Sequence, residues 1–264
     1  MSERVIVSMT SYPGRITNVG KAIYLLLTKQ TRKPDEIHLW LAIPQFPHKE
    51  KDLPDDLRTV LTMDKVYIHW LNKNTYVHKR HEIFKTTKDE DCVFLIDDDV
   101  RYADNLIQKV METHAKFPNC IVCYNQYSKH QYNGKRIIYG LPAPEKEPKA
   151  NWNRWCGQSM IPSKLYPKEI LDEAHQKIRN ETSPISDECW FQPWTVYYDI
   201  PIFHLHYGWG ENISKEIDMN KGLTRLTHVK QSNNYTYREN WMSAVLKAYP
   251  SILKKYIKLF GYKL

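Results

Sequence analysis

Three consecutive aspartates, Asp97, Asp98 and Asp99, follow the apolar segment CVFLI (92–96). If the chain is extended there, Asp97 and Asp99 point to one side and Asp98 to the other. Two carboxylates about 6 Å apart repel by about 3 kcal/mol at an effective dielectric of about 20. A divalent cation would offset this repulsion, because Mg²⁺ or Mn²⁺ takes oxygen ligands and leaves positions for water and phosphate. We therefore expect a metal ion here; an exposed acidic turn without a ligand is the alternative.

A phosphatase of the haloacid dehalogenase type also has two aspartates at the end of a strand, and its first aspartate is a nucleophile. That motif has Thr or Val two residues after the second aspartate, where this chain has Arg101. It also usually lies on the first strand, whereas the segment before Asp97 is the fourth strand-like segment of this chain. The pattern therefore disfavours a phosphatase.

The segments around the aspartates alternate between strand and helix patterns. Short apolar runs bounded by polar turns predict strands, and apolar residues at helical spacing predict helices. This alternation predicts an α/β fold with a Rossmann-type, mostly parallel central sheet and helices on both faces. Strands are expected at the start of RVIVSMTSYPGR and in DEIHLWLA, VYIHWL, CVFLI and CIVCY, and helices in NVGKAIYLLLTKQ, HKRHEIFKTTK and DNLIQKVMETHAKF, the last with Asp104 as its N-cap.

The polar turn MTSYPGR (9–15) follows the first predicted strand, and the aspartates follow the fourth. In open α/β sheets, ligands bind beyond the carboxyl ends of the strands. We therefore expect both segments to belong to one site.

The composition is that of a globular protein. Of the 264 residues, 42% are hydrophobic, and 38 Lys and Arg exceed 30 Asp and Glu to give a formal charge of +8. This charge favours anionic partners such as nucleotides or acidic lipids. The first apolar run, VIV (5–7), is too short for a signal peptide, and no segment reaches membrane-spanning length. Five cysteines without disulfide-like spacing are then expected to be reduced thiols in the cytoplasm.

Five motifs occur in the order VSMTSYPGRI, LLTKQTRKPDEIHLWLA, FLIDDDVRYADNL, CGQSMIPSKLYP and ISDECWF. This ordered set resembles bacterial GT-A-type glycosyltransferases that build polysaccharides such as capsule and lipopolysaccharide. The resemblance covers most of residues 4–230. It implies one GT-A-like domain over residues 1–264, with a nucleotide-binding half to about 125, an acceptor and catalytic half over about 126–230, and a helical tail over about 231–264.

The resemblance implies a role for each aspartate. Asp97, Asp98 and Asp99 match the family's DxD motif, which binds the ribose of a nucleotide sugar and, through a divalent metal, its diphosphate. It implies that Asp97 and Asp98 contact the donor and that Asp97 and Asp99 hold Mn²⁺ or Mg²⁺, with Asp99 as the direct ligand. The metal would assist departure of the diphosphate as a Lewis acid.

Other residues of the first half match the donor pocket of the family. Thr10, Ser11 and Arg15 match the turn that lines the nucleotide, and Lys79 matches a lysine that contacts the base or the diphosphate. The alternatives are a solvated loop arginine at position 15 and an exposed helical lysine at position 79.

The second half supplies the acceptor side. Gly157 matches a turn beside the donor sugar, where a glycine permits close backbone approach. Asp187 and Glu188 match an acidic pair that carries the general base of inverting members, which deprotonates the acceptor hydroxyl. The family usually has Asp-Asp or Glu-Asp here, so the base stays ambiguous, with Glu188 favoured by register. The same pair also fits a first helical turn after an N-cap at Ser186.

A third metal ligand in this family is often a late histidine. Candidates are His204 and His206, which would share a strand face, and His228, which we favour on chain position. An imidazole ligand would favour Mn²⁺. Among the aromatic residues of the second half, we expect Trp155 and Trp209 to contact the acceptor, although most aromatic side chains would build the core.

The segment beyond Pro250 is predicted to be an amphipathic helix with an apolar side and a lysine-rich side. Such a helix suits an anionic membrane surface, which would help an enzyme with a lipid-linked acceptor, and we expect peripheral contact at the inner face of the plasma membrane. A helix packed on the body, or a dimer contact, is the alternative. The apolar side has Ile252, Tyr256 and Leu259, and the other side has Lys254, Lys255 and Lys258.

The sequence thus predicts a hexosyltransferase that moves a sugar from a nucleotide donor, expected to be UDP-linked, to a bacterial surface glycan or lipid-linked acceptor, with inversion. A sugar-phosphate nucleotidyltransferase is a second hypothesis, but it would need a Gly-rich basic phosphate loop, and SMTSYPGR has one Gly and one Arg. A non-catalytic polyanion-binding protein is a third. In this chain, however, the lysines are scattered and no nucleic-acid-binding module is recognisable, so no nucleic-acid partner is expected.

Overall fold

A seven-stranded sheet forms the centre of the protein. The computed structural model describes residues 3–124, 131–132, 137–138, 147–148, 158–205 and 234–261. The strand order is β3-β2-β1-β4-β8-β5-β9, and all neighbouring pairs are parallel except those that β8 makes with β4 and β5. The expected α/β class, with a mostly parallel central sheet flanked by helices, is confirmed.

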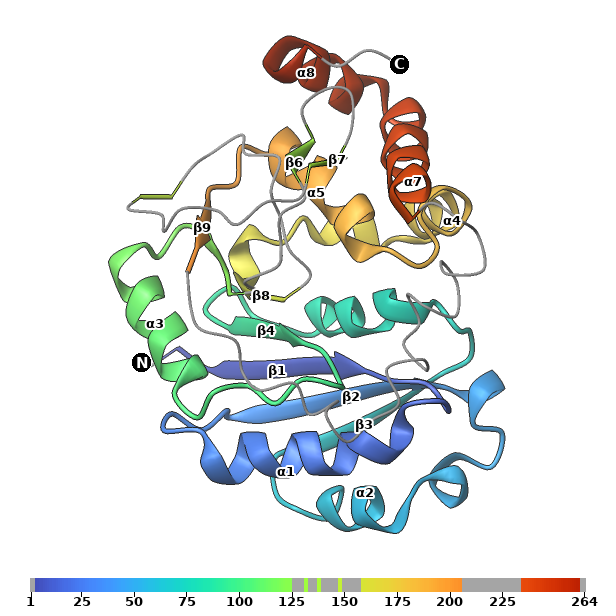
Figure 1. Cartoon of the computed structure of the whole chain (residues 1–264), viewed down its shortest axis with the longest axis vertical. Helices are drawn as coiled ribbons and strands as arrows, with labels where there is room; N and C mark the ends of the chain where they lie inside the picture. Colours follow the sequence, from blue (N-terminus) through green and yellow to red (C-terminus); the bar gives the residue numbers. More distant parts are fainter. Residues whose placement is uncertain are drawn as a thin grey trace.

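Helices cover both faces of this sheet (Figure 1). On one face, α1, α2 and α3 pack against strand residues such as Val7 and Phe94. On the other face, the 3₁₀ segment Tyr76–Lys85 and helices α5, α7 and α8 pack against residues such as Ile6 and Leu95. Successive strand side chains thus enter opposite cores, which explains why the strand segments are almost continuously apolar.

The helices and strands have the following bounds. The main sheet has β1 Val5–Thr10, β2 Glu36–Ala42, β3 Val66–Leu71, β4 Cys92–Ile96, β5 Ile121–Cys123, β8 Ser159–Pro162 and β9 Ile202–His204. A small antiparallel pair has β6 Gln131–Tyr132 and β7 Ile137–Ile138. The helices are α1 Val19–Lys29, α2 Asp55–Val60, α3 Leu106–Lys116, α4 Glu173–Thr182, α5 Asp187–Tyr197, α7 Asn234–Ala248 and α8 Pro250–Phe260.

The N-terminus of α3 differs from the prediction. Asp104 is not its N-cap: the helix begins at Leu106 after Asn105, which makes no side-chain cap hydrogen bond. The side chain of Gln30 takes this role, because its Oε1 accepts from the Ile107 backbone N–H at 3.1 Å and its Nε2 donates to the Ala103 carbonyl at 2.7 Å. The cap comes from a residue far away in the sequence, so the local pattern could not reveal it.

The C-terminal helix α8 packs on the body of the protein. Ile252 and Tyr256 are buried in the core, whereas Leu259 is 41% exposed, so the predicted apolar side of three residues is wrong in its last member. Lys255 is not on a free face either, because its Nζ contacts Asp199 Oδ2 at 2.6 Å and donates to the Tyr197 carbonyl at 2.9 Å. Lys255 thus connects α8 to the end of α5 and to the loop that follows it.

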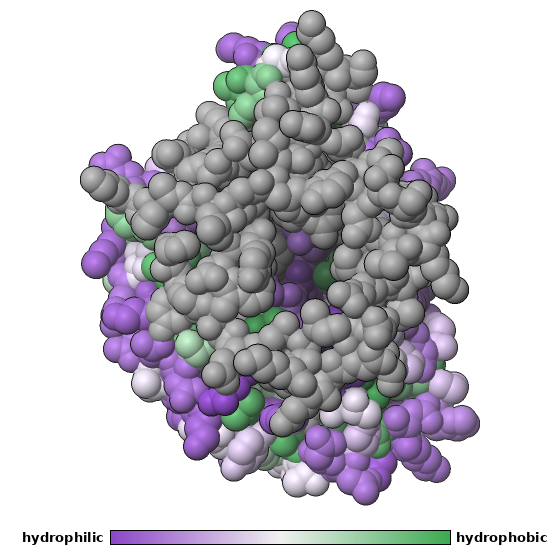
Figure 2. Space-filling model, viewed as in Figure 1, coloured by the Kyte–Doolittle hydropathy of each residue, from purple (hydrophilic) through white to green (hydrophobic). Residues whose placement is uncertain are grey.

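The described surface residues on the face shown in Figure 2 are mostly hydrophilic. Within the part of the chain that the structure describes, no helix is both long and apolar enough to cross a bilayer.

Candidate active site

The carboxyl ends of β1 and β4 open into a pocket of about 290 Å³. This is the position that an open α/β sheet offers to a ligand. The pocket brings together nine residues that the sequence predicts for the site: Thr10, Ser11, Arg15, Lys79, Asp97, Asp98, Asp99, Asp187 and Glu188. It also has residues that the sequence reasoning missed, among them Tyr12, Gln45, Asn74, Tyr76 and Arg80.

The turn after β1 places Arg15 in this pocket. The Arg15 backbone N–H donates to the Tyr12 carbonyl at 2.9 Å, which closes the turn. Gly14 lies against the Tyr12 ring, and a Cβ atom at this position would come within 2.7 Å of a ring carbon. The absence of a side chain at Gly14 thus lets the Tyr12 ring pack closely against the turn, and the side chain of Arg15 contacts the aspartates.

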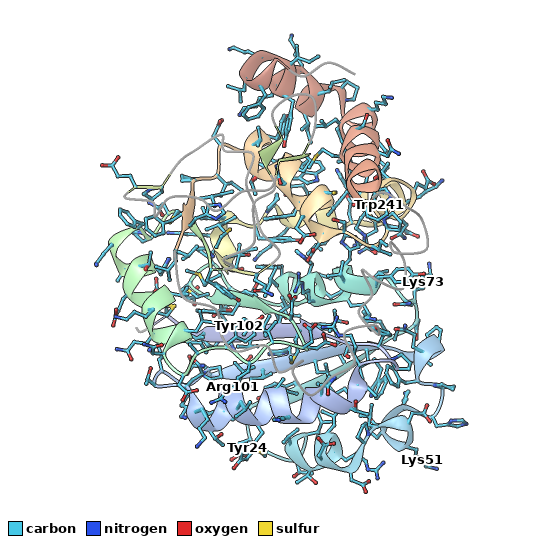
Figure 3. The ribbon with its side chains drawn as sticks, viewed as in Figure 1. Tyr24, Lys51, Lys73, Arg101, Tyr102 and Trp241 are labelled. Carbon is cyan, nitrogen blue, oxygen red and sulfur yellow. The ribbon has the colours of Figure 1, made fainter. Side chains whose placement is uncertain are left out.

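The first aspartate is held by a buried arginine. Arg80 Nη1 donates to Asp97 Oδ1 at 2.7 Å, and the Gln158 side chain also donates to this carboxylate. The Asp97 backbone N–H donates to the Tyr102 hydroxyl at 2.9 Å. Tyr102, which follows Arg101 in the segment labelled in Figure 3, is buried and thereby fixes the start of the aspartate turn.

The other two aspartates share one partner. Arg15 Nη2 contacts Asp98 Oδ1 at 2.7 Å and also makes an ion pair with Asp99. The Ser11 hydroxyl donates to the second oxygen of Asp98 at 2.5 Å. The predicted alternation, with Asp97 beside Asp99 and Asp98 opposite, is therefore wrong: β4 ends at Ile96, and the aspartates follow in a turn.

Burial makes the charges of this turn costly. It raises the pKa of Asp98 to about 6 and also raises the pKa of Asp99, while the Arg15 guanidinium acts in the opposite direction on both. The side chains of Asp97 and Asp99 are 36% and 30% exposed, whereas that of Asp98 is 7% exposed. Asp97 and Asp99 are thus the two carboxylates open to a ligand.

A buried ion network joins this turn to helix α5. Arg80 donates through Nε and Nη2 to Asp187 Oδ2, at 3.0 and 2.5 Å, and also to Asp97. His81 Nε2 lies 3.2 Å from the same Asp187 oxygen. Burial alone would raise the pKa of Asp187, but the Arg80 guanidinium and His81 hold it well below its usual range. Arg80 and His81 therefore stabilise Asp187 as a buried anion.

Glu188 is the second member of the acidic pair. It lines the pocket, and its Oε2 accepts a hydrogen bond from the Ser186 hydroxyl at 3.1 Å. The Ser186 side chain also accepts from the Cys189 backbone N–H, so the predicted N-cap of α5 is confirmed. The first turn of a helix thus positions Glu188 at the pocket wall.

Lys79 is buried and surrounded by neutral acceptors. Its Nζ donates to the Ser11 carbonyl at 3.3 Å, to Gln45 Oε1 at 3.0 Å and to Asn74 Oδ1 at 3.1 Å. Burial lowers the pKa of Lys79 to about 8. The alternative of an exposed helical lysine is therefore wrong, and its cation faces the pocket without a carboxylate bound to its Nζ among the described residues.

The charge of the pocket suits a divalent cation. Five carboxylates and three cationic side chains line it, which leaves a formal excess of two negative charges. Mg²⁺ is commonly bound by one or two carboxylates together with phosphate oxygens of a substrate. Asp97 and Asp99 fit this donor set by their oxygen chemistry and exposure.

Four predicted site residues, Gly157, Trp155, Trp209 and His228, lie outside the described residues. His206 does as well, while His204 is buried on β9.

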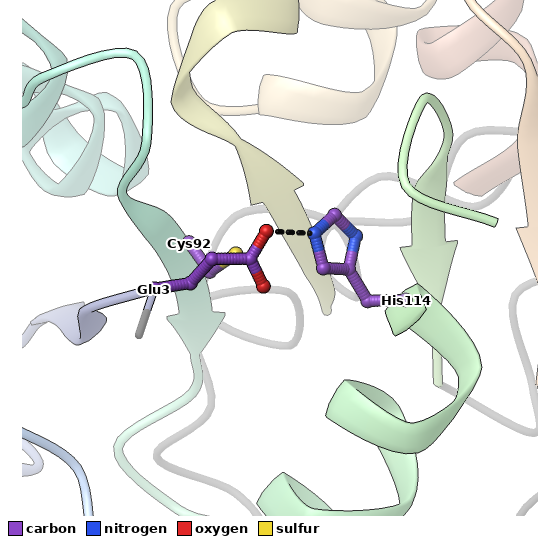
Figure 4. A group of neighbouring side chains, drawn as sticks. All are labelled: Glu3, Cys92 and His114. Atoms are coloured by element: carbon purple, nitrogen blue, oxygen red, sulfur yellow. Dashed lines mark hydrogen bonds and ion pairs between the residues drawn. The ribbon is translucent and has the colours of Figure 1, made fainter. Parts of the chain in front are cut away.

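A second group of ligand-type side chains lies elsewhere. Glu3, Cys92 and His114 each offer an atom within 4.8 Å of the others, and no other described residues form such a group of three (Figure 4). The closeness of these side chains is explained without a metal ion, because His114 Nε2 pairs with Glu3 Oε1 at 3.1 Å. Burial raises the pKa of the Cys92 thiol to about 12, so it is protonated at neutral pH. Cys92 begins β4, so this group lies at the opposite edge of the sheet from the pocket.

Comparison with known proteins gives a distant structural likeness. No protein-family model and no curated protein matches the sequence. Among solved structures, S. aureus TarS 1-349 in complex with UDP is similar at 12% identity and TM-score 0.45, covering 78% of this chain and 59% of that chain. S. aureus TarS 1-349 is similar at 11% identity and TM-score 0.46, covering 97% and 72% respectively. This chain thus spans only 59% of the first of these structures.

Proposed function

We propose that the protein is a metal-dependent glycosyltransferase that uses a nucleotide-sugar donor, UDP-linked, and transfers the sugar with inversion. The observation that carries this proposal is the pocket at the ends of β1 and β4. Three aspartates, two arginines and a lysine lie there together with Glu188 of α5. The arginines and the lysine suit a polyphosphate, the aspartates suit a divalent cation, and Glu188 supplies a carboxylate that could accept a proton.

The donor's diphosphate would bind beside the aspartate turn. Arg15 and Lys79 supply the positive charge toward it, and the Thr10–Arg15 turn supports the nucleotide. A divalent metal, Mn²⁺ or Mg²⁺, would be held by Asp99 and Asp97. When bound, it would neutralise charge on the departing diphosphate.

Glu188 would act as the general base. A general base must accept the acceptor hydroxyl's proton as the oxygen attacks the anomeric carbon. Asp187 is the weaker candidate, because the two hydrogen bonds from Arg80 and the contact with His81 lower the basicity of its carboxylate. Its role is to fix the first turn of α5, and with it Glu188.

The acceptor side of the proposal rests on the motif order of the sequence. We propose a bacterial surface glycan or a lipid-linked precursor as the acceptor, with the protein held near an anionic membrane. On α8, Ile257 and Leu259 are 48% and 41% exposed, and Lys254 and Lys258 are exposed beside them, so these residues are available for such contact.

The donor half of the proposal can be tested without knowing the acceptor. We expect purified protein to hydrolyse one of a panel of UDP-sugars slowly in the presence of Mn²⁺ or Mg²⁺, and chelation to abolish this. Asp99→Asn and Asp97→Asn should lower turnover at least about 100-fold, because loss of one preorganised charge at a transition state costs about 10²–10³.

Asp104→Asn is the matched control, because Asp104 is exposed and outside the pocket lining. It should keep full activity. Metal-independent turnover that is unchanged in Asp97→Asn and Asp99→Asn would contradict the proposed function.

A further inference from the structure

Arg15 makes an unusual bridge between two aspartates. A single atom, its Nη2, contacts Asp98 at 2.7 Å and also pairs with Asp99. The Arg15 side chain is only 15% exposed, so water screens these contacts weakly. A guanidinium nitrogen thus lies between two carboxylates, in the kind of position that a bound metal cation takes.

The arrangement also explains how three neighbouring carboxylates can lie close together despite their mutual repulsion. The sequence alone assigns that task to a metal, but Arg15 and Arg80 already give each aspartate a cationic partner. A divalent ion that binds Asp99 therefore approaches a carboxylate that Arg15 already contacts. A divalent ion and the Arg15 guanidinium on the same carboxylate would repel each other, because like charges about 4 Å apart interact strongly in a partly buried site.

Asp98 and Asp99 differ in how readily they could bind an incoming divalent ion. Asp98 keeps the Ser11 hydroxyl as a second partner at 2.5 Å, and it is buried. Asp99 is the more exposed and is the one open to an incoming ion. The Arg15 side chain projects from a turn whose backbone is closed by its own N–H, so the guanidinium can move within the pocket while its backbone stays in place.

We propose that Arg15 is a resident counter-ion which a divalent cation displaces from Asp99, and that the released guanidinium then binds the donor's diphosphate. This inference rests on the proposed function. It predicts weak binding of the metal alone, because the ion must displace Arg15 without giving it a new partner. With the nucleotide present, Arg15 gains a partner, so metal and nucleotide bind cooperatively, and each raises the affinity of the other by the same factor.

The test measures binding and not turnover. Free Mn²⁺ is followed by electron paramagnetic resonance in titrations of the wild type, Arg15→Gln and Arg101→Gln, each with and without UDP. Arg101 is the matched control, because it is an exposed arginine two residues after Asp99 and outside the pocket lining. Arg15→Lys is a second variant that keeps a positive charge on the turn, and thermal unfolding checks that every variant is folded.

Without UDP, we expect Arg15→Gln to bind Mn²⁺ about tenfold more tightly than the wild type, because a competing cation has been removed. Arg101→Gln should change this affinity less than threefold, about the effect of an exposed charge. In Arg15→Gln, UDP affinity at saturating Mn²⁺ should fall about tenfold, as expected for loss of one charged hydrogen-bonding partner. The factor by which UDP raises Mn²⁺ affinity should fall with it.

Unchanged or weaker Mn²⁺ binding by Arg15→Gln without UDP would overturn the inference, and so would an equal rise in Arg101→Gln. If the wild type binds no Mn²⁺ even with UDP, the inference also fails. The hydrolysis of UDP-sugars by the wild type is measured separately. Failure of the Arg15 inference and failure of the proposed function can therefore be told apart.

Discussion

At the scale of single residues, the two acids of α5 are predicted to have different roles: Glu188 in catalysis and Asp187 in stability. The sequence alone could not separate these roles. Glu188→Gln should lower glycosyl transfer by about 10²–10⁴, the usual contribution of a general base, and should leave UDP affinity and thermal stability nearly unchanged. Asp187→Asn should instead lower the free energy of unfolding by about 3–5 kcal/mol, because it leaves Arg80 buried without its main counter-ion. Kinetics and urea denaturation of both variants measure the two effects.

This assignment is open to a clear contradiction. A stable Asp187→Asn protein that has lost transfer, next to an active Glu188→Gln protein, would make Asp187 the base. Glu173→Gln is a suitable control, because Glu173 also lies in the first turn of a helix, on α4, and is exposed.

The residues that the sequence revealed are those with a local signal. The aspartates follow an apolar strand, and Arg15 follows a Pro-Gly turn. Arg80 has no such signal, because its partners Asp97 and Asp187 are 17 and 107 positions away. The burial of Lys79 likewise has no local signal, because its Nζ contacts Gln45 and Asn74 only in the folded chain.

At the scale of helices and strands, apolar patterns predicted β1 to β5 but not β8 or β9, and they did not predict how the segments contact one another. The pattern of β1, β2 and β4 was predictable because these strands are buried on both faces, whereas the edge strand β3 is only partly buried. The cap of α3 by Gln30 and the antiparallel entry of β8 between β4 and β5 were not, since both depend on contacts between distant segments. The same limit applies to α8, where periodicity cannot tell a face packed on the body from a face that binds a membrane.

The packing of α8 leads to a prediction at this scale. Ile252→Ala should lower the free energy of unfolding by about 2–5 kcal/mol, because it leaves a cavity in the core. Ile257→Ala on the next turn should change it by less than about 0.5 kcal/mol, because Ile257 is on the exposed side. Urea denaturation followed by circular dichroism measures both. Equal small effects would show that α8 does not pack on the body in solution.

At the scale of the whole molecule, the order of the strands joins the two halves of the chain. β8 comes from the second half, yet it lies between β4 and β5 of the first half. The core on its α5 side combines side chains of β1 and β4 with those of α5, α7 and α8. The two parts of the chain on either side of the boundary predicted near residue 125 therefore share one sheet.

This shared sheet predicts a single cooperative unfolding transition. Neither half can bury its share of that core alone, so secondary structure and the environment of Trp190 and Trp194, both buried on α5, should be lost together. Far-ultraviolet circular dichroism and tryptophan fluorescence in urea should give coincident curves, and a fragment of residues 1–124 should fail to fold because it lacks β8 and α5. Two separated midpoints, or a folded fragment, would instead show that the nucleotide half is an independent domain.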